Sequence, residues 1–121
     1  MQIIGRRELL PEDVNEAIDY AENKTAAYDK YVFTVCLAYG SREEMLNAIQ
    51  SIAAEHAAGD LPLDAIDETA VSTRLYTGEM PDPDLVIRTS GEERISNFLL
   101  WQMAYSELYF TCLLYTSPSP R

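Results

Sequence analysis

Residues 84–110 read DLVIRTSGEERISNFLLWQMAYSELYF, and this stretch decides the fold expected for the chain. Leu85, Val86 and Ile87 form a short apolar run of the kind found in a parallel strand that is buried on both faces. The run passes directly into Arg88, so a charged turn is predicted at the carboxyl end of a core strand. Because ligands of open parallel sheets bind at such strand ends, the stretch predicts a binding site beside Arg88.

Several residues after this strand suit the binding of a diphosphate. Arg88 and Arg94 each carry a planar, permanently charged guanidinium that can hold two phosphate oxygens at once. Gly91 lets backbone approach a ligand closely, and Ser96 stands where a helix over residues 97–103 would begin, adding a hydroxyl and free amides. The alternative that the spacing leaves open is a structural loop whose arginines pair with acidic neighbours, namely Glu92, Glu93 and Glu107.

Strands and helices alternate along the rest of the chain. Apolar runs predict strands at residues 1–5 and 31–38, and apolar residues at helical spacing predict helices that begin at Pro11, Ser41 and Asp64. Ser41 followed by Glu44 has the form of a capping box, and Asp64 is expected to cap the third helix, which ends near Leu75. This order predicts the α/β class, with a partial parallel sheet flanked by helices.

Three other residues are candidates for a role at the site. Glu107, set among aromatic residues, either pairs with an arginine or ligates a Mg²⁺ ion that bridges to phosphate oxygens. Arg42 follows a second predicted strand, and a structural role is the preferred interpretation because its neighbours Glu43 and Glu44 can neutralise it. Trp101, in an apolar segment, is expected to pack rather than to catalyse.

The charge of the chain limits its partners. It has 20 acidic and 9 basic residues and a formal net charge of −11, which argues against nucleic acid or an anionic membrane as a general partner. No apolar run approaches the ~20 residues of a membrane span, and no apolar leader is present. A cytoplasmic protein is expected.

The opening stretch closely resembles the C-terminal signature of the cis-prenyltransferases, the undecaprenyl diphosphate synthase family. The motifs that carry the resemblance are DLVIRTSGE from Asp84, RISNF from Arg94, WQ from Trp101 and ELYF from Glu107. Weaker matches are MQIIG from Met1 and AYGSREE from Ala38, so that the resemblance covers residues 1–111.

The resemblance implies a Mg²⁺-dependent transferase that condenses isopentenyl diphosphate with an allylic diphosphate to make a cis-polyprenyl diphosphate, such as the bacterial cell-wall lipid carrier undecaprenyl diphosphate. Carried over residue by residue, it implies isopentenyl diphosphate binding by Arg88, Arg94, Ile95 and Ser96 and a Mg²⁺ ligand at Glu107. It also implies a homodimer, with peripheral membrane contact through the lipid product. No nucleophilic side chain is required, so no catalytic residue is assigned.

The sequence departs from the family at both ends. Family members begin with a half that carries the allylic diphosphate loop and the tunnel for the growing chain, and its motifs are absent here. Residues 112–121, CLLYTSPSPR, also depart, and their Ser-Pro repeats predict a disordered, non-native tail. We therefore expect residues 1–111 to be the C-terminal portion of a cis-prenyltransferase domain, inactive on its own. A non-catalytic subunit and a generic diphosphate-binding α/β module remain as alternatives.

Overall fold

The structure, a computed structural model, describes residues 1–112. Its elements, in chain order, are β1 (Gln2–Ile4), the 3₁₀ turn η1 (Arg7–Leu9), α1 (Glu12–Thr25), β2 (Thr34–Cys36), α2 (Ser41–Ala57), the 3₁₀ turn η2 (Leu63–Ala65), α3 (Glu68–Arg74), β3 (Leu85–Arg88) and β4 (Glu107–Phe110). Apart from Cys112, the expected tail of residues 112–121 lies outside the described residues.

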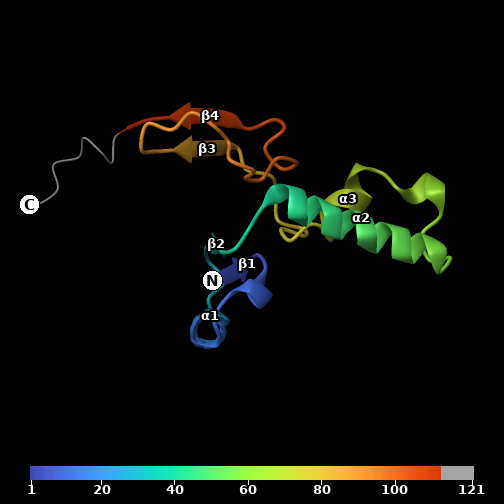
Figure 1. Ribbon diagram of the computed structural model, residues 1–121, viewed down its shortest axis with the longest axis horizontal. Helices are drawn as coiled ribbons and strands as arrows, with labels where there is room; N and C mark the ends of the chain where they lie inside the picture. Colours follow the sequence, from blue (N-terminus) through green and yellow to red (C-terminus); the bar gives the residue numbers. More distant parts are fainter. Residues whose placement is uncertain (113–121) are drawn as a thin grey trace, which may run out of the picture.

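The described strands form two parallel pairs, which confirms the α/β class. β1 pairs with β2 and β3 pairs with β4, each in parallel register. Figure 1 shows α1 beside the first pair, the α2–α3 pair extending away from it, and the β3–β4 pair separate from both. The partial sheet expected from the sequence is therefore divided into two two-stranded pieces.

Gly5, which follows β1, packs against the backbone just after β2. Gly5 follows β1 with a φ of +134°, and a Cβ built on it would lie 1.7 Å from the carbonyl oxygen of Leu37. The neighbouring amides bond across the same point, Leu37 N to Ile4 O at 2.9 Å and Arg6 N to Ala38 O at 3.1 Å. Only glycine permits this close backbone approach, so β1 and β2 depend on it.

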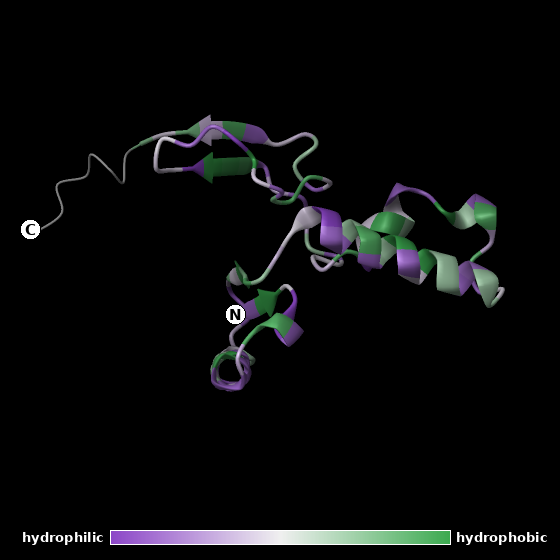
Figure 2. Cartoon of the chain, viewed as in Figure 1, coloured by the Kyte–Doolittle hydropathy of each residue, from purple (hydrophilic) through white to green (hydrophobic). Residues whose placement is uncertain are grey.

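The α2–α3 pair holds most of the small core. Ala48 and Ile52 of α2 are buried, as are Ala70 of α3 and Leu75 just after it. The hydropathy colours of Figure 2 show apolar bands along α2 that alternate with polar ones. Ile49, which the apolar spacing also places in the core, is 56% exposed, so the buried stripe is narrower than predicted. Neither α2 nor any other helix of the described residues is long and apolar enough to cross a membrane.

The cap of the third helix differs from the prediction. Asp67, and not Asp64, is the N-cap of α3, and its carboxylate accepts a hydrogen bond from Ala70 N at 2.8 Å. The reason is local, because Asp64 lies inside η2, which follows Pro62, and the chain re-enters helical geometry only after Asp67.

The strand β3 is less buried than its apolar run predicts. Leu85 is 53% exposed and Ile87 57% exposed, and all four residues of β4 are exposed. Parallel strands are normally covered on both faces. The expectation of a strand buried on both faces is wrong here, because the described residues cover only the face of the pair from which Val86 projects toward Met103.

Candidate functional site

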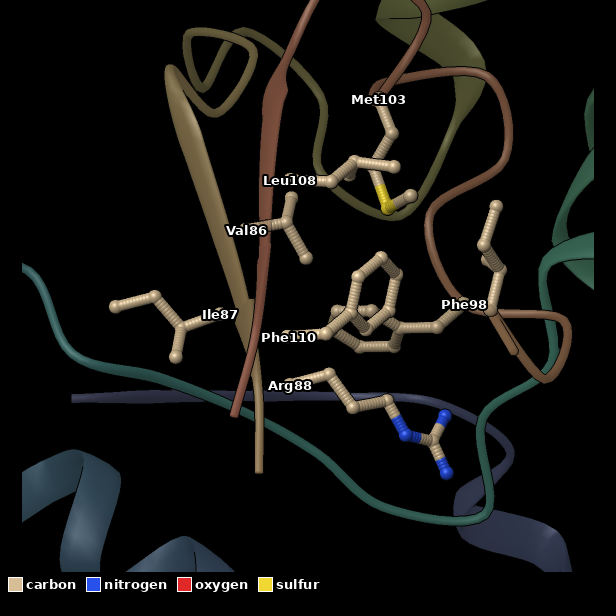
Figure 3. Close-up of a pocket in the computed structure, with 8 residues that line it drawn as sticks. Val86, Ile87, Arg88, Phe98, Met103, Leu108 and Phe110 are labelled. Carbon is tan, nitrogen blue, oxygen red and sulfur yellow. The ribbon is translucent and has the colours of Figure 1, made fainter. Parts of the chain in front are cut away.

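Arg88 lies at the rim of an apolar cavity on one face of the β3–β4 pair. Arg88 ends β3 and is opposite Phe110 of β4. Figure 3 shows Arg88 and Phe110 on one side of the pair and Ile87 on the other. The cavity encloses about 90 Å³, and its lining residues are Val86, Ile87, Arg88, Ile95, Phe98, Met103, Leu108 and Phe110. A charged group beside an apolar cavity suits a ligand with an anionic head and a short apolar tail.

The loop after β3 folds back onto Arg88. Ser90 and Gly91 have positive φ values of 69° and 70°, which reverse the chain direction. The guanidinium Nη1 of Arg88 then donates to the carbonyl oxygen of Arg94 at 2.9 Å. The predicted pair of arginines is therefore brought together through the backbone, and Ile95 next to them lines the cavity.

Arg94 is exposed, and among residues 1–112 it has one acidic partner. Its side chain is 74% exposed, and its Nε lies 3.4 Å from a carboxylate oxygen of Glu92. The alternative interpretation of the sequence, in which the arginines of the loop pair with acidic neighbours, thus describes Arg94 in part. An exposed pair of this kind contributes at most about 1 kcal/mol, so it competes weakly with a diphosphate.

The helix predicted over residues 97–103 does not form. The segment consists of turns, and Ser96, Asn97 and Leu99 have φ values of 54°, 61° and 48°. Residues in the left-handed region cannot continue a right-handed helix, so the expected helix amides beside Ser96 are missing. The apolar content of the segment is accounted for by packing of Phe98 and Met103 on the cavity.

Glu107 lies away from Arg88. Glu107 begins β4 opposite Leu85, three register positions from the Arg88–Phe110 pair, a separation of about 10 Å along the strand. Because side chains alternate along a strand, Glu107 also projects from the opposite face of the pair. No group of three metal-ligating side chains occurs in the described part of the chain. The Glu107 carboxylate is the donor type that Mg²⁺ prefers, but residues 1–112 do not complete a set of ligands around it.

A buried carboxylate that the sequence interpretation did not assign connects the segments around the site. Glu44 of α2 is fully buried, and it accepts hydrogen bonds from Tyr39 Oη at 2.5 Å, Tyr76 N at 2.8 Å and Gln102 Nε2 at 3.1 Å. Burial raises the pKa of the Tyr39 phenol well above its ordinary value, and the hydrogen bond to Glu44 adds to the shift. The signal in the sequence was the spacing of Glu44 with Ala48, which places the acid on the buried face of α2.

The capping box predicted for α2 is also wrong. Gly40 is the N-cap, and the Ser41 hydroxyl accepts a hydrogen bond from Leu100 N at 2.9 Å instead of capping its own helix. Two acceptors from Asn97 cap the helix: its carbonyl oxygen takes Ser41 N at 2.8 Å, and its Oδ1 takes Arg42 N at 2.9 Å. Sequence reasoning missed Asn97 because it lies 55 positions from Arg42.

Arg42 is not neutralised as expected. Glu43 pairs instead with Arg6, at 3.3 Å, and Glu44 takes the buried bonds described above. Among residues 1–112 Arg42 makes no ion pair, and it lines an open depression together with Arg6 and Asn97.

Trp101 packs against α3, as its apolar surroundings predict. Its indole Nε1 donates to Ser72 Oγ at 3.0 Å. Phe98 packs edge-on against Tyr39, with ring centroids 5.8 Å apart. These contacts give both aromatic residues a structural role, and Phe98 also lines the cavity.

The sequence is similar to one protein family over nearly its whole length. The family model described as "Putative undecaprenyl diphosphate synthase" matches residues 1–119. A tritrans,polycis-undecaprenyl-diphosphate synthase (geranylgeranyl-diphosphate specific) of Pyrococcus horikoshii is 51% identical over 110 residues, which are 91% of this chain and 42% of the relative. An isoprenyl transferase of Geobacter sulfurreducens is 46% identical over 118 residues, 98% of this chain and 48% of the relative. The chain thus spans less than half the length of these relatives.

Two solved structures are similar to this one. The first is lavandulyl diphosphate synthase from Lavandula x intermedia in complex with dimethylallyl diphosphate, with a TM-score of 0.87 and 43% identity over 91% of this chain and 48% of that chain. The second is a probable undecaprenyl diphosphate synthase from Campylobacter jejuni, with a TM-score of 0.74 and 32% identity over 90% of this chain and 48% of that chain.

Proposed function

The chain belongs to the cis-prenyltransferase family, and from this premise we propose that it supplies the isopentenyl diphosphate site of an enzyme that condenses isopentenyl diphosphate with an allylic diphosphate. Arg88, Arg94 and Ser96 bind the diphosphate, and Ile95 contacts the isopentenyl group. The observation that carries the proposal is the guanidinium of Arg88 at the rim of the apolar cavity. Isopentenyl diphosphate has the matching form, an anionic head on a short apolar tail.

Arg88 and Arg94 have hydrogen-bond donors available for this ligand. A guanidinium has five N–H groups, and one of those of Arg88 is used by the carbonyl oxygen of Arg94. Among residues 1–112 the others make no hydrogen bond, and they suit two phosphate oxygens in a bidentate contact. The exposed Glu92 carries one charge, whereas a diphosphate carries more, so the ligand displaces Glu92 from Arg94.

In the proposed reaction the double bond of isopentenyl diphosphate attacks the allylic carbon as the allylic diphosphate leaves, and loss of a proton forms the new cis double bond. The residues of this chain act by holding one reactant in position and by offsetting its charge. They donate no proton and form no covalent bond to substrate.

Glu107 is the proposed Mg²⁺ ligand of this chain. A Mg²⁺ held there would supply positive charge to a diphosphate, although in residues 1–112 Glu107 lies about 10 Å along the strand from Arg88 and on the opposite face of the pair. The other ligands have to come from the substrate and from outside residues 1–112, because the described part of the chain holds no cluster of ligating side chains.

The proposals for the second substrate, the product and the assembly rest on the substrates and products of the relatives and on the exposed surface of the chain. An allylic diphosphate is the second substrate, in keeping with dimethylallyl diphosphate in the lavandulyl diphosphate synthase structure. The product is a cis-polyprenyl diphosphate of the undecaprenyl type. The whole enzyme is a cytoplasmic homodimer that meets the membrane through its lipid product, and exposed apolar residues such as Tyr105 and Tyr109 support the dimer contact.

The test is a hybrid enzyme in which the N-terminal half of the Pyrococcus horikoshii relative precedes this chain. Arg88→Ala and Arg94→Ala are each expected to raise KM for isopentenyl diphosphate by about 10- to 100-fold, because each removes a charge-assisted contact worth about 1.5–3 kcal/mol. KM for the allylic substrate stays unchanged. The measurement is initial rates with the two diphosphates varied separately.

The control is Lys30→Ala, which removes an exposed cation that precedes β2. It should leave both KM values as they are. An unchanged KM for isopentenyl diphosphate in both arginine variants would contradict the assignment of the site.

A further inference from the structure

A strained turn follows the proposed diphosphate loop. Ser96 and Asn97 both lie in the left-handed region, with φ values of 54° and 61°. Residues with side chains seldom adopt this conformation, and it persists only where surrounding contacts impose it. The contacts that impose it here come from the first turn of α2.

Asn97 caps α2 from outside the helix. The carbonyl oxygen of Asn97 accepts Ser41 N at 2.8 Å, and its side-chain Oδ1 accepts Arg42 N at 2.9 Å. A helix N-terminus leaves such amides without partners unless an acceptor is supplied. Gly40, the N-cap residue, has no side chain to supply one, and the Ser41 hydroxyl is occupied by Leu100 N.

The glycine before α2 leaves room for this contact. A Cβ built at Gly40 would lie 2.8 Å from Nδ2 of Asn97, closer than side-chain carbons approach other atoms. Gly40 therefore admits the Asn97 side chain to the helix end. Gly40 and Asn97 act together: because Gly40 has no side chain, there is space for Asn97 to cap α2.

This cap fixes the position of the diphosphate loop. Ser96 directly precedes Asn97, and the carbonyl oxygen of Arg94, two residues before Ser96, accepts a hydrogen bond from Arg88 Nη1 at 2.9 Å. The loop of residues 89–96 is thus anchored to β3 by Arg88 and to α2 by Asn97. We propose that Asn97 is a positioning residue for isopentenyl diphosphate: it holds Ser96 and Arg94 where the diphosphate needs them, through its cap on α2. This inference rests on the proposed function of the loop.

The experiment uses the 121-residue chain and measures isopentenyl diphosphate binding by titration calorimetry, with inorganic diphosphate as a second probe. Asn97→Ala is expected to weaken binding of both about tenfold. Asn97→Gly, which relieves the strain of the positive φ but still lacks the side-chain acceptor Oδ1, is expected to weaken binding as much. It therefore provides a second measurement if the alanine variant fails to fold. Hydrogen exchange at the Arg42 amide should accelerate in both variants.

The matched control is Asp67→Ala, which removes the cap of α3 by breaking its 2.8 Å bond from Ala70 N. It should lower the midpoint of thermal unfolding without changing diphosphate binding. In the unsubstituted chain, bound diphosphate should slow exchange at the Arg42 amide, and in Asn97→Gly it should not.

The outcomes separate this inference from the proposed function. If the unsubstituted chain does not bind isopentenyl diphosphate, the proposed function fails and the positioning role fails with it. If that chain binds but Asn97→Ala and Asn97→Gly bind equally well, the positioning role alone is overturned. Equal weakening by Asp67→Ala would also overturn it, since the effect would then be general loss of stability.

Discussion

Replacing Glu44 should destabilise the chain more than replacing any exposed acid. Glu44 is fully buried and accepts hydrogen bonds from Tyr39, Tyr76 and Gln102. Removing the acid leaves its buried donors without an acceptor, which costs about 1–3 kcal/mol for each donor, and these costs do not add in full because the three donors share one side chain. We therefore expect Glu44→Ala to lower the free energy of unfolding by about 3–5 kcal/mol.

Glu44→Gln, a smaller change at the same position, should lower the free energy of unfolding by less than Glu44→Ala does. In Glu44→Gln the amide oxygen can still accept from Tyr39 and Gln102, whereas the amide nitrogen faces Tyr76 N, which donates to Oε2 in the native chain at 2.8 Å. One buried donor is then left without an acceptor, which costs about 1–3 kcal/mol. Glu44→Gln should thus fall between the unsubstituted chain and Glu44→Ala.

The assay is urea unfolding followed by circular dichroism at 222 nm. The matched control is Glu43→Ala, because that neighbouring side chain is 48% exposed and, among residues 1–112, pairs with the exposed Arg6, a contact that solvent screens. Should Glu44→Ala fail to fold, the glutamine variant still gives a midpoint. A loss in Glu44→Ala no larger than in Glu43→Ala would refute the reasoning, and Glu44 would then have no role in holding the segments around the site.

Three other outcomes are expected. Hydrogen bonds from Arg74 lower the pKa of Glu55 below its ordinary 4.5, so this contact stabilises the fold above that pH and is lost as the pH falls through the lower folded-state pKa. Glu55→Gln should therefore make the melting temperature depend less on pH between pH 5 and pH 3. An unchanged pH dependence would exclude the contact. Trp101→Phe removes the 3.0 Å bond to Ser72 Oγ and should lower the free energy of unfolding by about 1 kcal/mol in chemical denaturation, whereas equal stability would mean that the bond is replaced by water. The 121-residue chain alone should give no prenyl transfer from an allylic primer and labelled isopentenyl diphosphate, because only one reactant is positioned; turnover by the chain alone would show that the catalytic site has been misplaced.

Local patterns in the sequence predicted most of the secondary structure. Apolar spacing located α1 and α2, and the apolar runs located β1, β2 and β3, because these signals depend on neighbours within one or two turns or a few strand residues. The helix expected over residues 97–103 is the main error. Its apolar residues fit helical spacing, but the backbone there is set by bonds from Ser41 and Arg42 to Asn97, more than fifty positions away.

The sequence predicted part of the candidate site, but not the distances between its residues. The place of Arg88 and Arg94 at and after a strand predicts that they lie close together, and Arg88 Nη1 donates to the carbonyl oxygen of Arg94. Ile95, which only the family resemblance implied, lines the cavity with Arg88. The distance of Glu107 from Arg88 could not be read from the sequence, because it depends on the register of β4 against β3. The burial of Glu44 likewise depends on Gln102, 58 positions away.

The cap of α2 by Asn97 also sets an order of events in folding. The contact closes a loop of 55 residues, whose closure costs about 3.5 kcal/mol of chain entropy before any contact offsets it. β1, α1 and β2 lie within the first 36 residues, and pairing β1 with β2 closes a loop that is shorter than 55 residues and largely occupied by α1, so they can assemble while the chain is still being synthesised. α2 can form at the same stage, but the amides of its first turn have no cap until Asn97 binds them. The diphosphate loop and the start of α2 should therefore acquire their native structure in the same late kinetic step.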